Sequence, residues 1–92
     1  MAVATISQIT SDVKQVLPIY DTTLYDTELS MLVQGAMHKL ENEGVKNIFD
    51  YQTPAYYDYL TCIRYQVACD MDLDIDIERL KAQYITRVNT LR

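Results

Sequence analysis

Glycine and proline are scarce in this chain, whose 92 residues contain two of each. These residue types are the strongest breaks between regular elements, and both glycines fall within or just after a helical pattern of apolar residues. Long helices joined by a few loops are therefore expected. The length fits one domain, residues 1–92. We predict an all-α fold, a small bundle of about four helices with long interhelical loops.

Two helices are predicted in the first half of the chain, where apolar side chains recur at three- and four-residue steps. The first covers residues 6–16, with Thr5 or Ser7 available as a cap at its start. The second covers residues 27–43, and Gly44 suits the left-handed position that follows a helix end.

The middle of this second helix contains Gly35 and Ala36. Glycine inside a helix destabilises it by about 1 kcal/mol relative to alanine, so its presence there needs a reason. We predict that another helix crosses closely at Gly35, where a larger side chain would overpack the contact.

Two further helices are predicted in the second half. The third covers residues 54–70, after a Thr53 cap and with Pro54 at the first helical position. The fourth covers residues 75–91. Residues 70–77 alternate between aspartate and apolar side chains, which also fits a half-buried strand, but no second strand signal of equal strength is present to pair with it.

Tyrosine is abundant, with eight in the chain and five of them between residues 51 and 65. Residues 56, 57 and 59 cannot all share one helical face, so some of these rings point outward. Tyrosine combines apolar area with a hydroxyl that tolerates water, which suits a protein interface. The interface we predict consists of Tyr20, Tyr25, Tyr57 and Tyr59. The alternative is that the tyrosines surround the edge of a small core.

Charge is distributed unevenly along the chain. Thirteen acidic against eight basic residues give a net charge of −5, which argues against a general nucleic-acid binder. The last helix has basic residues along an apolar stripe, an arrangement typical of an interface rim, although the helix dipole also favours basic residues there. We therefore predict a C-terminal docking helix that meets a partner through Lys81, Tyr84, Arg87, Val88, Leu91 and Arg92. The alternative is that this stripe packs on the second and third helices.

No set of residues predicts catalysis. His38 is the single histidine and is expected at the surface, with no nucleophile and orienting carboxylate placed beside it by a motif. Cys62 and Cys69 lie seven residues apart, about 10 Å along a helix, so they are expected as buried free thiols and not as a disulfide. We predict neither an enzyme nor a cofactor.

No apolar run approaches the length of a membrane span, and the N-terminus lacks the features of an export signal, so a soluble, unexported protein is expected.

The alternating aspartates Asp70, Asp72, Asp74 and Asp76 resemble the start of a calcium-binding loop. The rest of that motif fails, because counting from Asp70 the sixth residue is Ile75 instead of glycine and the twelfth is Lys81 instead of glutamate. We predict no metal site and interpret the stretch as a solvated acidic junction that caps the last helix or faces a partner.

The order of elements resembles a known family. Asp12-Val-Lys-x-x-Leu17 is followed by a short acidic loop with Tyr20 and by Leu24-Tyr-Asp-x-Glu-Leu-x-x-Leu-Val33-x-x-Ala36. This opening, continued by a loop into Pro54 and two further helices, resembles the head-tail connector (head-completion adaptor) proteins of tailed bacteriophages. The chain departs from the family's usual third helix in its early tyrosines and late aspartates.

The resemblance implies a structural virion protein without catalytic activity. Such a protein assembles with itself as a closed ring, twelvefold in the arrangement the resemblance implies, between the portal protein and the next connector, stopper or tail protein. The ring extends the channel through which DNA passes without specific binding. The expected location is the virion neck at the capsid vertex, and the host cytoplasm during assembly. In this family the last helix commonly docks on the portal, and the acidic stretch 70–76 would contact a neighbour or line the channel.

Two other functions remain open from the sequence. One is a small acidic helical regulator or inhibitor that binds a host protein, for instance as a dimer. A helix-turn-helix DNA binder comes third, because no candidate recognition helix pairs a basic face with a glycine turn.

Overall fold

The computed structural model describes residues 3–16, 26–71 and 77–91 of the chain. These ranges contain the helices α1 (Ile6–Val16), α2 (Asp26–Asn42), α3 (Pro54–Met71) and α4 (Ile77–Leu91) and no strand longer than a single bridge. The predicted all-α fold is confirmed, and each predicted helix boundary lies within two residues of the observed one. Residues 70, 71 and 77 are helical, while the remainder of the alternating stretch, 72–76, lies outside the described residues.

The helix starts are set by local side-chain chemistry. At α1 the Gln8 backbone N–H donates to Thr5 Oγ1 at 3.1 Å and the Thr5 N–H donates to Gln8 Oε1 at 2.9 Å. This reciprocal pair is a capping box, so Thr5 and not Ser7 is the cap. At α3 the Tyr56 N–H donates to Thr53 Oγ1 at 3.3 Å, as the predicted cap before Pro54 requires.

The end of α2 is a Schellman motif. Gly44 has a φ of 90°, the left-handed conformation predicted for it. Its N–H donates to the Glu41 carbonyl at 3.0 Å, and the Val45 N–H donates to the Leu40 carbonyl at 2.9 Å. Leu40 and Val45 are both buried, which adds the apolar contact that accompanies this motif.

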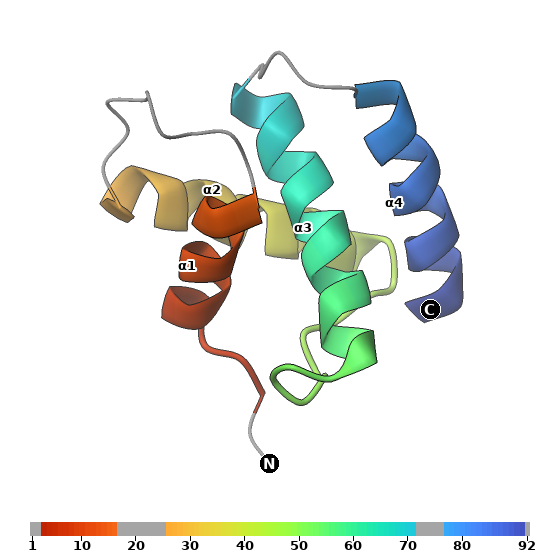
Figure 1. Ribbon diagram of the computed structural model, residues 1–92, viewed down its shortest axis with the longest axis horizontal. Helices are drawn as coiled ribbons and strands as arrows, with labels where there is room; N and C mark the ends of the chain where they lie inside the picture. Colours follow the sequence, from red (N-terminus) through yellow and green to blue (C-terminus); the bar gives the residue numbers. More distant parts are fainter. Residues whose placement is uncertain (1–2, 17–25, 72–76, 92) are drawn as a thin grey trace.

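The core is built around α3, which packs against each of the other three helices. In Figure 1, α3 lies between α1 and α4, and α2 crosses behind it. Because neighbours cover α3 on more than one side, its buried residues do not form a single stripe. They are Tyr56, Tyr59, Leu60, Cys62, Ile63, Val67 and Ala68.

The prediction that another helix crosses closely at Gly35 was wrong, and the packed residue is the next one, Ala36. A Cβ built at Gly35 would meet no atom within 4 Å, so this side of α2 is open. The neighbouring Ala36 is fully buried in the core and is the small residue that α2 turns inward. Periodicity placed both residues near the contact, and only the tertiary arrangement decides between them.

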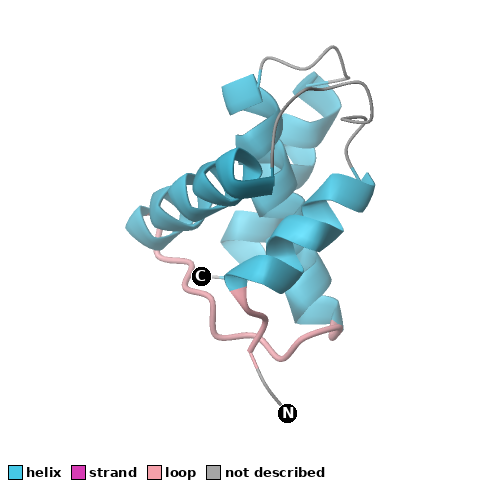
Figure 2. Cartoon of the chain, turned by 90° about the vertical axis from the view of Figure 1, so that its left-hand side faces the viewer, coloured by secondary structure: helices cyan, strands magenta, loops and turns pink. Residues whose placement is uncertain are grey.

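The start of the chain is held beside the loop that joins α2 to α3. Val3 and Asp50 form an antiparallel bridge, and Asn47 Nδ2 donates to the Ala4 carbonyl at 3.1 Å. Figure 2 shows the two segments side by side at the end of the molecule where α3 begins. Ala4 and Val45 are buried there and extend the core beyond the helices.

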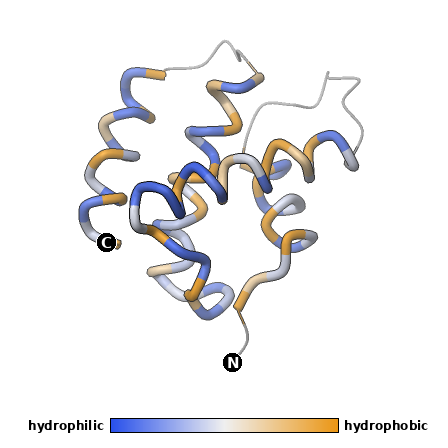
Figure 3. Tube along the Cα trace, turned by 180° about the vertical axis from the view of Figure 1, so that it is seen from behind, coloured by the Kyte–Doolittle hydropathy of each residue, from blue (hydrophilic) through white to orange (hydrophobic). Residues whose placement is uncertain are grey.

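The last helix is peripheral. α4 packs against α3 with Val88 as its single buried residue among the described ones. Ile77, Leu80, Tyr84 and Leu91 are partly buried against the core. Seen from behind in Figure 3, α4 again lies at the outer edge of the molecule.

Candidate functional site

Tyrosines from α3 and the loop before it form a small aromatic cluster. The ring centroids of Tyr51 and Tyr56 lie 5.0 Å apart, and those of Tyr56 and Tyr57 lie 5.4 Å apart, both edge to face. The Tyr56 hydroxyl donates to Asp12 Oδ2 at 2.6 Å and so joins α3 to α1. Burial first, and the Asp12 carboxylate second, raise the pKa of Tyr56. Tyr57 is the outward member of the cluster, with 49% of its surface exposed.

The predicted contact residues therefore divide. Tyr57 is available to a partner, as the interface prediction requires. Tyr59 is 1% exposed and its ring packs 5.5 Å from Phe49, so its prediction as a contact residue was wrong. The reason is that α3 is covered on two sides, which turns both Tyr56 and Tyr59 inward. Tyr20 and Tyr25 lie outside the described residues.

The interior also holds Cys62, and burial raises the pKa of its thiol to about 12. A thiol in this state is not a nucleophile at neutral pH. Cys62 is a buried free thiol as predicted, whereas Cys69 is free but exposed, which corrects the prediction that both are buried. His38 lies exposed on α2, in agreement with its prediction.

The apolar stripe of α4 is used within the chain. Val88 is 4% exposed, and Tyr84 stacks on Tyr65 of α3 with ring centroids 4.7 Å apart. Leu91 is partly buried against the same core. The prediction that Val88 docks on a partner was wrong, because α3 already covers it. The alternative placed the stripe on the second and third helices, and it is confirmed for the third.

The basic residues of α4 also divide. Arg87 Nε lies 3.0 Å from Asp58 Oδ1 on α3, so its charge has a partner inside the chain, and its role in docking stays a prediction. Lys81 is exposed. Arg92 lies outside the described residues. The outer side of α4 is thus the part that a docking partner could reach.

The acidic junction is described only at its start. Asp70 Oδ1 accepts from Lys39 Nζ at 3.0 Å, an exposed ion pair that links α3 to α2. Asp72, Asp74 and Asp76 lie outside the described residues.

Within the described ranges, no three histidine, cysteine or carboxylate side chains are grouped as a metal site would need. Those same ranges contain no helix that is both long and apolar enough to cross a membrane.

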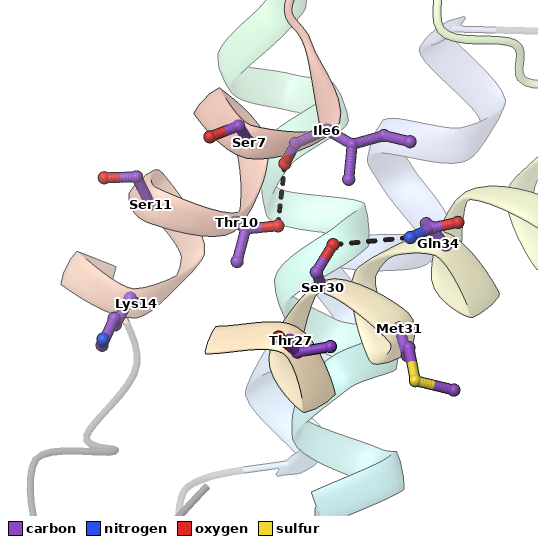
Figure 4. Close-up of a pocket in the computed structure, with 9 residues that line it drawn as sticks. All are labelled: Ile6, Ser7, Thr10, Ser11, Lys14, Thr27, Ser30, Met31 and Gln34. Carbon is purple, nitrogen blue, oxygen red and sulfur yellow. Dashed lines mark hydrogen bonds between the residues drawn. The ribbon is translucent and has the colours of Figure 1, made fainter. Parts of the chain in front are cut away.

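A wide groove separates α1 from α2, with a volume of about 610 Å³ (Figure 4). Its described lining is mostly hydroxyl and amide side chains, with Lys14 as the single charged group. Two hydrogen bonds lie inside the lining, from Thr10 Oγ1 to the Ile6 carbonyl at 2.7 Å and from Gln34 Nε2 to Ser30 Oγ at 3.4 Å. None of the nine described lining residues is a carboxylate, histidine or cysteine, so this lining offers no acid–base pair for catalysis.

A second hollow lies between the end of α1 and the outer side of α3. We call it the Arg64 notch, and it is lined by Val16, Tyr57, Leu60, Thr61 and Arg64, with a volume of about 150 Å³. Leu60 forms its buried floor, whereas Val16 and Tyr57 are 43% and 49% exposed. The notch is therefore an apolar hollow with an aromatic and an aliphatic edge.

Comparison with known proteins gives no relative: no family model, no curated protein and no solved structure matches the chain. The site must be interpreted from its own geometry.

Arg64 is the residue of this surface that sequence reasoning missed. Its Nη2 donates to Gln83 Oε1 of α4 at 3.3 Å, and its Nε is buried without a hydrogen-bond partner among the described residues. Burial lowers the pKa of the guanidinium. A signal was present in the sequence, because Arg64 is the single basic residue in the eighteen residues of α3 and follows the buried Ile63.

Proposed function

We propose that the protein is a structural subunit of a bacteriophage neck, which assembles as a ring between portal and tail and joins the two during head completion. The proposal starts from the resemblance to head-tail connector proteins. The all-α bundle is the architecture that this resemblance implies, and the net charge of −5 suits a channel wall that DNA passes without binding.

The observation that carries the proposal is the distribution of exposed apolar side chains over separate elements. Val16 ends α1, Met31 lies on α2, Tyr57 on α3 and Ile85 on α4, and all four are substantially exposed. A ring subunit needs two different faces for its neighbours and further faces for the components above and below. A regulator that binds one host protein needs only one such face.

Docking on the portal would use the outer side of α4. Lys81 and Ile85 lie one turn apart there and both are exposed. A basic and an apolar group on one face provide the mixed contact of an interface rim.

Negative-stain imaging of the purified protein, alone and with capsid vertices that lack a neck, tests the proposal. We expect closed rings on the vertices, and light scattering separates a ring from the dimer of a regulator by mass. A Lys81→Glu, Ile85→Ser variant should fold and lose vertex binding, whereas the matched exposed change Lys46→Glu should not affect it. Vertices that stay bare with the wild-type protein would refute the function.

A further inference from the structure

The Arg64 notch has an incomplete set of interactions. A half-buried guanidinium is stable when a carboxylate neutralises it and accepts its N–H groups, because both its charge and its five donors are costly to desolvate. Among the described residues Arg64 makes no ion pair that would neutralise its charge. It makes one hydrogen bond there, to the neutral Gln83 amide. Its Nε is enclosed and has no acceptor in that part of the chain, so the part of the guanidinium that lines the notch is the part that a partner could reach. The notch therefore fits a ligand that brings a carboxylate.

The rest of the notch indicates what must accompany that carboxylate. Leu60 is buried at the floor, and the exposed Val16 and Tyr57 form the edges of a hollow of about 150 Å³. An unbranched apolar side chain fills such a space best, since it adapts its rotamers to an irregular hollow. The complementary surface is thus one carboxylate and one flexible apolar side chain within a helical turn of each other.

The chain itself carries this pair on α2. Glu28 and Met31 lie three residues apart, so they share one face of the helix. Both are exposed, and Met31 is 66% exposed, the most of any large apolar residue in the described helices. Glu28 makes no ion pair within the described ranges. In Figure 4 the Met31 side chain extends away from the α1 residues that line the groove.

We propose that the Arg64 notch of one copy receives the Glu28–Met31 face of α2 from a second copy, with the carboxylate on Arg64 and the methionine against Tyr57 and Val16. The inference deepens the ring assembly and rests on that proposed function. The two surfaces share no residue and belong to different helices, so the contact is heterologous and leaves the pair with an unused notch on one copy and an unused α2 face on the other. Such contacts propagate until a ring closes, whereas an isologous contact would stop at a dimer.

Charge reversal with complementation tests the pairing. In sedimentation velocity over a concentration series, the wild-type chain should form assemblies larger than a dimer. Arg64→Glu and Glu28→Arg should each raise the midpoint concentration of assembly by about tenfold or more, because each places like charges in the contact. An equimolar mixture of the two variants should assemble again, since each supplies the surface that the other lacks. The matched reversals Lys46→Glu and Glu41→Arg, at exposed positions outside both surfaces, should leave the midpoint unchanged.

Arg64→Glu also removes the bond to Gln83, so its folding must be checked by circular dichroism. Met31→Ser supplies the second variant, because an exposed side chain can be replaced without touching the core, and it too should weaken assembly. Midpoints that stay at the wild-type value in the folded variants would overturn the pairing while leaving the ring in place. Failure of the mixture to assemble would overturn it as well. A wild-type chain that remains a single copy or stops at a dimer in solution also overturns it, and imaging on vertices then decides the neck function separately.

Discussion

The helices α3 and α4 are similar in length and lie side by side, yet the chain uses them in opposite ways. α3 is covered on several sides and buries seven described residues, whereas α4 buries only Val88. Electrostatic links add to the α3–α4 contact through Arg87 with Asp58 and Arg64 with Gln83, but these groups are partly exposed and contribute little. The stability of the domain therefore depends on α3, and α4 is a layer added to one side of it.

The largest effect is expected where α3 is most enclosed. Tyr59→Ser should lower the free energy of unfolding by about 3–5 kcal/mol, the range for removing a buried aromatic ring, as measured by urea denaturation. The matched surface change Tyr57→Ser should alter it by less than about 0.5 kcal/mol. Tyr59→Phe should cost nothing or stabilise slightly, because the buried hydroxyl has no hydrogen-bond partner in the described structure. Equal costs for Tyr57→Ser and Tyr59→Ser would contradict the two-sided burial of α3.

The sequence could predict where helices begin and end better than which faces they bury. Thr5, Thr53 and Gly44 act on backbone groups within four residues of themselves, so local chemistry is sufficient to identify them. Tyr59 and Gly35 depend on which neighbours a helix meets. Apolar spacing along a sequence identifies one buried stripe, and a helix packed on several sides, such as α3, has no single stripe.

The candidate site was less predictable for the same reason. The Arg87 and Asp58 pair and the Arg64 and Gln83 pair each join α3 to α4, and no spacing rule connects residues so far apart in sequence. Tyr57 and Tyr59 were both predicted as contact residues, because residues 56, 57 and 59 cannot share one helical face, and this spacing does not decide which of them points outward. Arg64 was missed although it is the single basic residue of α3, because the sequence does not show which side chains surround it.

The second effect depends on pH and also belongs to α3. Burial raises the pKa of Tyr56 and Tyr59 above the ordinary tyrosine value, and raises that of Cys62 to about 12. The unfolded chain loses these protons at about pH 8.5 for cysteine and pH 10 for tyrosine, before the native chain does. Stability is therefore constant near neutral pH and falls above about pH 8.5, with a slope of up to about 1.4 kcal/mol per pH unit for each group.

Urea denaturation at pH 9 and pH 10.5 measures this loss, which we expect to be about 3 kcal/mol for the wild-type chain. Tyr59→Phe removes one titrating group, so its loss should be about 1 kcal/mol smaller. A wild-type stability that rises between these pH values would show that the buried hydroxyls and thiol are already ionised in the native state.

The third effect tests the peripheral position of α4. Val88→Ala should lower the free energy of unfolding by about 1–2 kcal/mol, less than the α3 changes, because a smaller side chain is removed. In native-state hydrogen exchange, α4 amides should open at lower free energy than those of α3, since a helix held on one side can detach without global unfolding. Val67→Ala is the matched change in α3 and should affect the exchange of all the helices. Identical exchange free energies in α3 and α4 would mean that the two helices unfold as one unit.

The smallest expected change is an increase in the free energy of unfolding, and it distinguishes the open side of α2 from its packed side. Gly35→Ala should raise the free energy of unfolding by about 0.5–1 kcal/mol, because alanine favours the helix and its Cβ meets no atom within 4 Å. At the next position, Ala36→Leu should lower it by about 1–3 kcal/mol, since Ala36 is fully buried and a larger side chain overpacks the contact. Thermal denaturation checks both variants: Gly35→Ala should melt at a higher temperature than the wild-type chain and Ala36→Leu at a lower one. A destabilised Gly35→Ala would restore the close helix crossing expected from the sequence and place another element against that side of α2.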